Sequence, residues 1–148
     1  MARIEKSIEI KASVEKVFEF ASNWQNKLKW YPGIYDLKPT TEKTWGVGTR
    51  FGYKVKALGR EYPSEVEVTN FVENEGWIYT STKGIECKHQ YIFSPLDDQT
   101  RVTYIFEYKV PIAIIGGLLD ALVFKRRWEA NSEQALQNLK RLIEGQTA

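Results

Sequence analysis

The sequence predicts an α+β fold, in which a curved antiparallel sheet of about seven strands wraps on a long C-terminal helix. Three observations predict it. The chain opens with an alternating segment followed by two helical stretches, and it continues with several short segments in which apolar residues recur at every second position. It closes with a long segment of helical periodicity, residues 111–144. An antiparallel sheet with one apolar face needs a cover, and this last helix is long enough to supply it.

The N-terminal part predicts a strand and then two short helices. Apolar residues alternate with polar ones over residues 3–11, which is typical of a half-buried strand. Ser13 is a suitable N-cap for a first helix that continues at helical spacing to about Ser22. Residues 24–31 predict a second short helix, which ends at the Pro-Gly pair that follows.

From residue 34 onward the period changes to two. Turn residues separate the alternating segments, and such short connections favour antiparallel neighbours. The charged residues on the second face of each segment indicate that one face of the sheet meets water. The clearest segments are 51–57, 61–69, 77–82, 86–93 and 102–110.

Composition places the chain among ordinary globular proteins, and we expect residues 1–148 to form one ligand-binding domain. The net charge of +2 and the scattered basic residues argue against nucleic acid as a partner. One cysteine and one histidine exclude an internal disulfide and argue against a metal site, and no cofactor is expected. The first residues lack an apolar signal region and no stretch approaches membrane-spanning length, so the expected location is cytoplasmic.

Several stretches carry a resemblance to a known family: SIEIKA (7–12) with VEKVF (14–18), KWYPGI (29–34), WGVGTRF (45–51) and ALQNLKRLIE (135–144). In these stretches and in element order the chain resembles the START-related superfamily, also described as the polyketide cyclase/dehydrase and lipid-transport or birch-allergen-like group (SRPBCC). The resemblance implies a helix-grip fold with a cavity between the concave sheet face and the long helix. It carries over no catalytic residue, because the family uses one scaffold for carriers, cyclases, hydrolases and ligand sensors.

The inward faces of the predicted strands and helix supply the candidate ligand-binding residues. A mostly aromatic wall with a few hydroxyl groups suits a flat or elongated apolar ligand that carries some oxygen atoms. The alternative interpretation is that the same rings interlock as a core. The candidate residues are Tyr53, Tyr62, Tyr79, His89, Tyr91, Tyr104, Phe106, Tyr108, Leu118, Trp128 and Ser132.

Binding or transport of a hydrophobic small molecule, such as a lipid, a quinone or a polyketide-like compound, is the predicted function. The main alternative is a cyclase or dehydratase in which His89 and pocket tyrosines carry protons. Cys87 lies two residues earlier on the same face, but no third residue is identifiably placed to orient the pair. The balance favours a protein that is not an enzyme.

The segment 111–124 suggests a third function, because it is apolar nearly all round the predicted helix. Such a segment packs beneath the short helices, forms a lid over the cavity, or contacts a partner protein. The basic run Lys125–Arg127 directly after it makes a transient membrane contact a further possibility.

Overall fold

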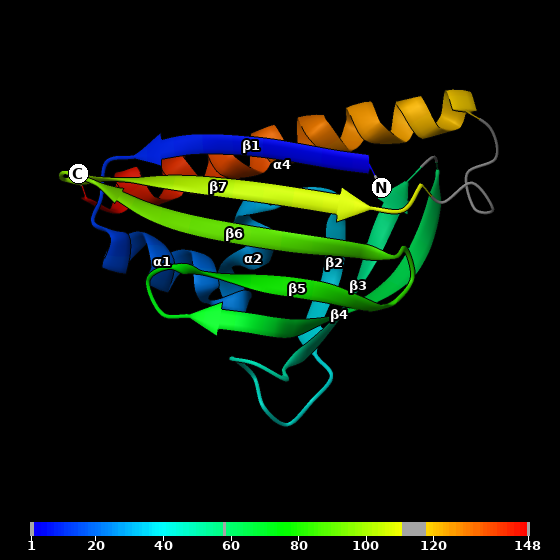
Figure 1. Cartoon of the computed structure of the whole chain (residues 1–148), viewed down its shortest axis with the longest axis horizontal. Coiled ribbons are helices and arrows are strands. Elements are labelled where there is room, and N and C mark those ends of the chain that lie inside the picture. The colour runs from blue at the N-terminus through cyan, green and yellow to red at the C-terminus, as the bar shows by residue number, and fades with distance from the viewer. Residues whose placement is uncertain (1, 58, 111–117, 148) are drawn as a thin grey trace.

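The computed structural model describes residues 2–57, 59–110 and 118–147, and in this range a seven-stranded antiparallel sheet curves beside a long helix (Figure 1). The predicted α+β class and the helix-grip architecture are confirmed. The strands are β1 (Ala2–Ile10), β2 (Ile34–Pro39), β3 (Arg50–Ala57), β4 (Arg60–Val72), β5 (Gly76–Lys83), β6 (Cys87–Leu96) and β7 (Gln99–Tyr108). The helical elements are α1 (Val14–Ser22), η1 (Trp24–Asn26), α2 (Lys27–Trp30) and α4 (Leu118–Thr147).

The strand order in the sheet is β1-β7-β6-β5-β4-β3-β2. Every neighbouring pair is antiparallel, as the short turns predict. The first strand joins the far end of the sheet by pairing with the last, from Ala2 opposite Tyr108 to Ile10 opposite Thr100. Strands β1 and β2 are therefore the two edges, and the strands between them carry the concave face.

The predicted first helix is α1. The Ser13 side chain accepts a hydrogen bond from the backbone N–H of Lys16 at 3.3 Å and so caps the helix. The predicted second helix, residues 24–31, consists of a 3₁₀ turn (η1) and the single turn α2. The side chain of Asn23 caps η1 by accepting a hydrogen bond from the backbone N–H of Gln25 at 3.1 Å.

Helix α4 covers the end of the concave face nearest to β1 and β7 (Figure 1). Its buried side chains recur at helical spacing, as the amphipathic pattern predicts. The helix continues through Gly145 to Thr147, whereas the sequence predicted that it ends before Gly145. Residues 111–117, with which the predicted helix began, lie outside the described residues. The buried positions are Phe124, Trp128, Ser132, Ala135, Leu136, Leu139 and Ile143.

At the start of β5 the backbone requires a glycine. Gly76 has φ +153°, and a Cβ atom added there would overlap the carbonyl oxygen of Tyr91 on the neighbouring strand. By contrast, Gly48 has φ +95° with nothing within 4 Å of an added Cβ. Gly76 therefore allows β5 and β6 to approach closely at the point where their ladder begins.

Candidate functional site

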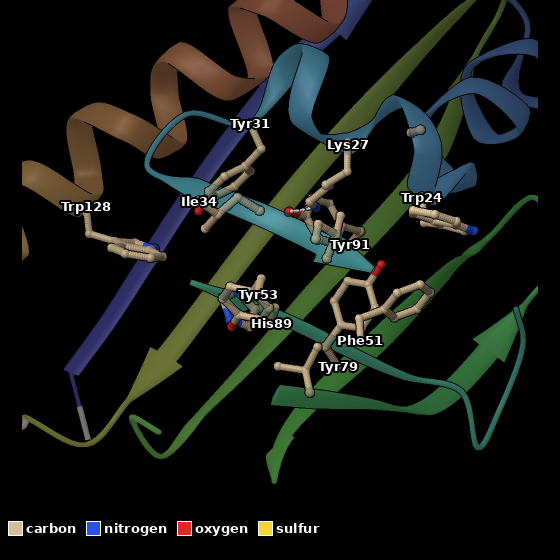
Figure 2. Close-up of a pocket in the computed structure, with 13 residues that line it drawn as sticks. Trp24, Lys27, Tyr31, Ile34, Phe51, Tyr53, Tyr79, His89, Tyr91 and Trp128 are labelled. Carbon is tan, nitrogen blue, oxygen red and sulfur yellow. Dashed lines mark hydrogen bonds between the residues drawn. The ribbon is translucent and has the colours of Figure 1, made fainter. Parts of the chain in front are cut away.

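A pocket opens between the concave face of the sheet, including its edge strand β2, and the helical segment η1–α2 (Figure 2). Trp24 and Trp128 mark two ends of its lining in this view. The empty space among the lining side chains is about 540 Å³, part of it open to solvent, and water-sized molecules can occupy about 40 Å³ of it. The lining residues are Ala21, Trp24, Lys27, Tyr31, Ile34, Leu37, Phe51, Tyr53, Val66, Tyr79, His89, Tyr91 and Trp128.

Five of the residues predicted from the sequence lie in this lining: Tyr53 on β3, Tyr79 on β5, His89 and Tyr91 on β6, and Trp128 on α4. Trp128 is the contribution of α4 among the described residues. The sequence predicted a cavity between the sheet and the C-terminal helix, but this pocket faces mainly the short helical segment after α1.

Three other predicted residues on β7 do not line the pocket. Tyr104, Phe106 and Tyr108 do face inward and are buried, but other side chains cover them. The Phe106 ring stacks on Trp128 with centroids 5.0 Å apart, and the Tyr108 ring packs 5.3 Å from Phe124. These rings therefore belong to the core beneath α4.

Two further predicted residues, Tyr62 and Ser132, are also outside the lining. Tyr62 is half-buried and packs against the core. Ser132 is fully buried, and its hydroxyl donates to the backbone carbonyl of Trp128 at 2.7 Å, one turn earlier in α4. The side chain of Leu118 is not among those the structure describes.

Among the lining residues that the sequence did not predict, Lys27 has the greatest chemical consequence. Its side chain extends from α2 toward the sheet, is 8% exposed, and donates to the phenolic oxygen of Tyr91 at 2.7 Å (Figure 2). Burial lowers the pKa of Lys27 well below its ordinary value. A signal was present, because Lys27 shares one helical face with Trp24 and Tyr31, at spacings of three and four residues.

His89 belongs to a chain of hydrogen bonds that leads from the lining into the core. Its Nδ1 lies 2.6 Å from the hydroxyl oxygen of Tyr104, which in turn lies 3.1 Å from that of Tyr31. On the other side, Nε2 of His89 lies 3.5 Å from the Cys87 sulfur. Burial, with the charge of Lys27 as a second cause, lowers the pKa of His89 to about 3. The imidazole is therefore neutral near pH 7 and a weak base.

The other titratable groups around the pocket are neutral as well. Burial raises the pKa of Tyr31 to about 12 and raises that of Tyr53 and Tyr79 from the usual value near 10. The same cause raises the pKa of the Cys87 thiol to about 12, so the sulfur is a poor nucleophile. At neutral pH the one side chain of the described lining able to carry a charge is Lys27.

The part of the chain that the structure describes contains neither a metal-binding cluster nor a membrane-spanning helix. No group of three or more His, Cys, Asp and Glu side chains in it is arranged to hold a metal ion. In the same residues no helix combines the length and the apolar character needed to cross a membrane.

The apolar segment 111–124 is described only at its end. Leu122 and Val123 are exposed by 44% and 41%, whereas Phe124 is buried against Tyr108. The exposed pair agrees with the apolar outer face expected there. Whether the segment is a lid, part of the core or a contact surface stays a prediction.

The family is decided by a match over nearly the whole chain. The profile of the family described as "Polyketide cyclase / dehydrase and lipid transport" matches residues 1–144. The chain belongs to this family. No curated protein matches the sequence.

Several solved structures resemble this family member. One is TTHA0849 from Thermus thermophilus, which is 21% identical with a TM-score of 0.83, and the match covers 99% of this chain and 100% of that chain. The Zhui aromatase/cyclase from Streptomyces sp. R1128 is 14% identical with a TM-score of 0.78 and coverages of 99% and 96%. A START superfamily protein from Mycobacterium smegmatis is 16% identical with a TM-score of 0.71 and coverages of 95% and 98%. The predicted membership of the START-related superfamily is confirmed, and at these identities the likeness concerns the fold.

Proposed function

We propose that this protein binds a hydrophobic small molecule, such as a lipid, a quinone or a polyketide-like compound, in the pocket between the sheet and the helical segment η1–α2. The observation that carries the proposal is the composition of the lining. Most of its side chains are aromatic or aliphatic, and a few polar atoms converge among them, which is the usual make-up of a small-molecule site.

The polar atoms in the lining supply orientation. The ammonium group of Lys27 and the hydroxyl groups of Tyr31, Tyr53 and Tyr79 come from three different parts of the fold, α2 with its C-terminal residue, β3 and β5. A ligand with oxygen atoms at matching places would be held in one orientation, while its apolar body packs on the rings.

The size of the pocket adds a requirement. About 40 Å³ is room for a few water molecules, much less than a ring-containing ligand needs. Binding therefore displaces side chains, and Trp24, Ile34 and Leu37 are among the half-buried lining residues that could move. Such a ligand stabilises the expanded form, so its binding raises the melting temperature.

The test is a fluorescence titration with N-phenyl-1-naphthylamine, a neutral apolar probe that brightens on leaving water. We expect saturable binding at one site. Ile34→Trp replaces an aliphatic side chain of the lining by a larger aromatic one and should weaken binding of the probe. Val47→Trp changes a residue that is 51% exposed and lies outside the lining, so it should leave binding unchanged. Mass spectrometry of organic extracts from the purified protein would also reveal a co-purified apolar molecule. A protein that is always empty and binds no such probe contradicts the proposal.

A cyclase or dehydratase that uses His89 receives less support from the site. A base with a pKa of about 3 has little tendency to take a proton from a substrate near pH 7. Both of its ring nitrogens also already have neighbours, Tyr104 and Cys87. Turnover of a polyketide-like substrate that is lost in His89→Gln, with binding retained, would reverse this preference.

A further inference from the structure

Lys27 is a buried cation held almost entirely by aromatic rings. Its Nζ lies 4.2 Å from the ring centroid of Tyr91 and 4.3 Å from that of Trp30. The rings of Tyr31 and Tyr79 follow at 4.9 and 5.7 Å. Ring faces attract an ammonium group, so this arrangement favours the charged form. Most lysines pack their carbon chain on apolar residues and place the ammonium group in water, whereas the ammonium group of Lys27 lies among rings.

The lysine lacks a counter-ion. No ion pair within the described residues includes Lys27, and none of the described lining residues is a carboxylate. An ammonium group has three N–H donors, and among the described residues Lys27 donates to the Tyr91 hydroxyl oxygen. Buried charges in proteins are normally paired, because an isolated one loses its hydration without replacement.

The lysine also faces the space that a ligand would fill. Lys27, Tyr31 and Tyr79 all belong to the pocket lining, as does Tyr91 to which it is bonded. Figure 2 shows the lysine chain descending from α2 into this group of rings. A negatively charged group that entered the pocket here would meet the two remaining donors and replace the lost hydration.

We propose that Lys27 recognises an acidic group of the ligand, so that the protein binds a flat apolar acid whose carboxylate pairs with the Lys27 ammonium inside the aromatic pocket. This inference rests on the proposed function and adds the chemical class of the ligand. Rings of the lining hold the apolar body of the acid, and the buried ion pair fixes its orientation.

Proton uptake on binding follows from this pairing. Burial lowers the pKa of Lys27 in the free protein, and an anion beside the ammonium group raises that pKa again, so binding of an acid favours proton uptake by Lys27. The other titratable groups around the lysine are those of Tyr31, directly after α2, and of Tyr53, Tyr79, Tyr91 and His89 on strands β3, β5 and β6. These groups stay neutral because burial opposes their charged forms. One proton at most is therefore taken up for each acid bound.

The experiment compares 2-naphthoate with 2-naphthamide, which has the same shape and no charge. In the unmodified protein we expect the acid to bind about tenfold or more tightly than the amide. Lys27→Met should remove this preference and leave the affinity for the amide within a factor of about three. Lys29→Met is the matched control, because Lys29 lies on the same turn but is exposed, and it should change neither affinity.

Calorimetry in two buffers of different ionisation enthalpy, repeated at several pH values from neutral to alkaline, measures the proton uptake. We expect uptake with the acid in the unmodified protein and none in Lys27→Met. The inference is overturned if the unmodified protein binds the acid and the amide with equal affinity or binds neither. It is also overturned if proton uptake is the same in Lys27→Met as in the unmodified protein. If N-phenyl-1-naphthylamine binds in those cases, the proposed hydrophobic binding function still stands. If it does not bind, both fail.

Discussion

The Nδ1 atom of His89 lies 2.6 Å from the phenolic oxygen of Tyr104, and this contact joins the wall of the pocket to the core behind it. Tyr104 is outside the lining, yet its hydroxyl also meets that of Tyr31 at 3.1 Å. One buried hydroxyl group on β7 therefore positions two lining residues, one from β6 and one from the end of α2.

Removal of that hydroxyl should destabilise the protein. Tyr104→Phe leaves the ring in place but deprives His89 and Tyr31 of a buried partner, so we expect a loss of about 1–3 kcal/mol in the free energy of unfolding, measured with urea. Tyr108→Phe is the control, since Tyr108 is buried on the same strand and its hydroxyl makes no hydrogen bond to the side chains that the structure describes. Equal losses in the two variants would show that the link to His89 contributes little.

His89 should remain neutral in the folded protein throughout mildly acidic conditions. It is the chain's one histidine, so its imidazole NMR signals are assigned without ambiguity. Because burial lowers its pKa to about 3, we expect those signals to stay constant from about pH 8 to about pH 5. A titration midpoint near the ordinary value of 6.5 would contradict the buried neutral imidazole.

The same shift makes stability depend on pH. Between pH 6.5 and about 3 the unfolded chain binds a proton at His89 that the folded protein does not. The free energy of unfolding should therefore fall as the pH drops through this window, by at most about 1.4 kcal/mol per pH unit from this group. His89→Gln removes the contribution, so its stability should fall less steeply with acid.

Helix α4 closes the core through a few fully buried side chains. Leu139 has no exposed surface, and Leu139→Ala should cost about 2–5 kcal/mol because it leaves a cavity between the helix and the sheet. Leu122 is a matched control on the same helix, since it is 44% exposed and its replacement by Ala should change stability by no more than about 0.5 kcal/mol. Denaturant unfolding of both variants tests the difference.

Gly76 should tolerate no side chain. Gly76→Ala combines an unfavourable backbone angle with an overlap against the Tyr91 carbonyl, and we expect a loss of roughly 3 kcal/mol or more. Gly48→Ala isolates the effect of the angle, because its added methyl group meets nothing within 4 Å, and should cost about 1–2 kcal/mol. Similar melting temperatures for the two variants would argue against the close approach of β5 and β6.

Sequence periodicity predicted which side chains face inward but could not divide them between core and pocket. Tyr53 and Tyr79 line the pocket, whereas Phe106 and Tyr108 face the same way and are covered by Trp128 and Phe124 of α4. A period of two records the face of a strand and carries no information on what lies above each position. That information requires the path of the helix over the sheet.

Lys27 was missed for a different physical reason. A lysine in a short polar helix is usually exposed, and Lys29 two residues later is. Position 27 is buried because the Lys27 side chain reaches the rings of Tyr79 on β5 and Tyr91 on β6, which are distant in the sequence. The sequence does place this charged residue on the helical face that also carries Trp24 and Tyr31. A charged residue on an otherwise aromatic face often marks a functional site.

The pairing of β1 with β7 has a consequence for how the protein folds. Each other neighbouring pair in the described sheet joins strands that are consecutive in the chain, so β2 to β7 can add to one another by local hairpins. Strand β1 is synthesised first but finds its partner only after β7 exists, and it also packs against α4. Most of the entropy of loop closure therefore falls on one late step. We expect the docking of the N-terminal strand to limit the folding rate, and on the ribosome that strand must wait unpaired while the rest of the sheet is made.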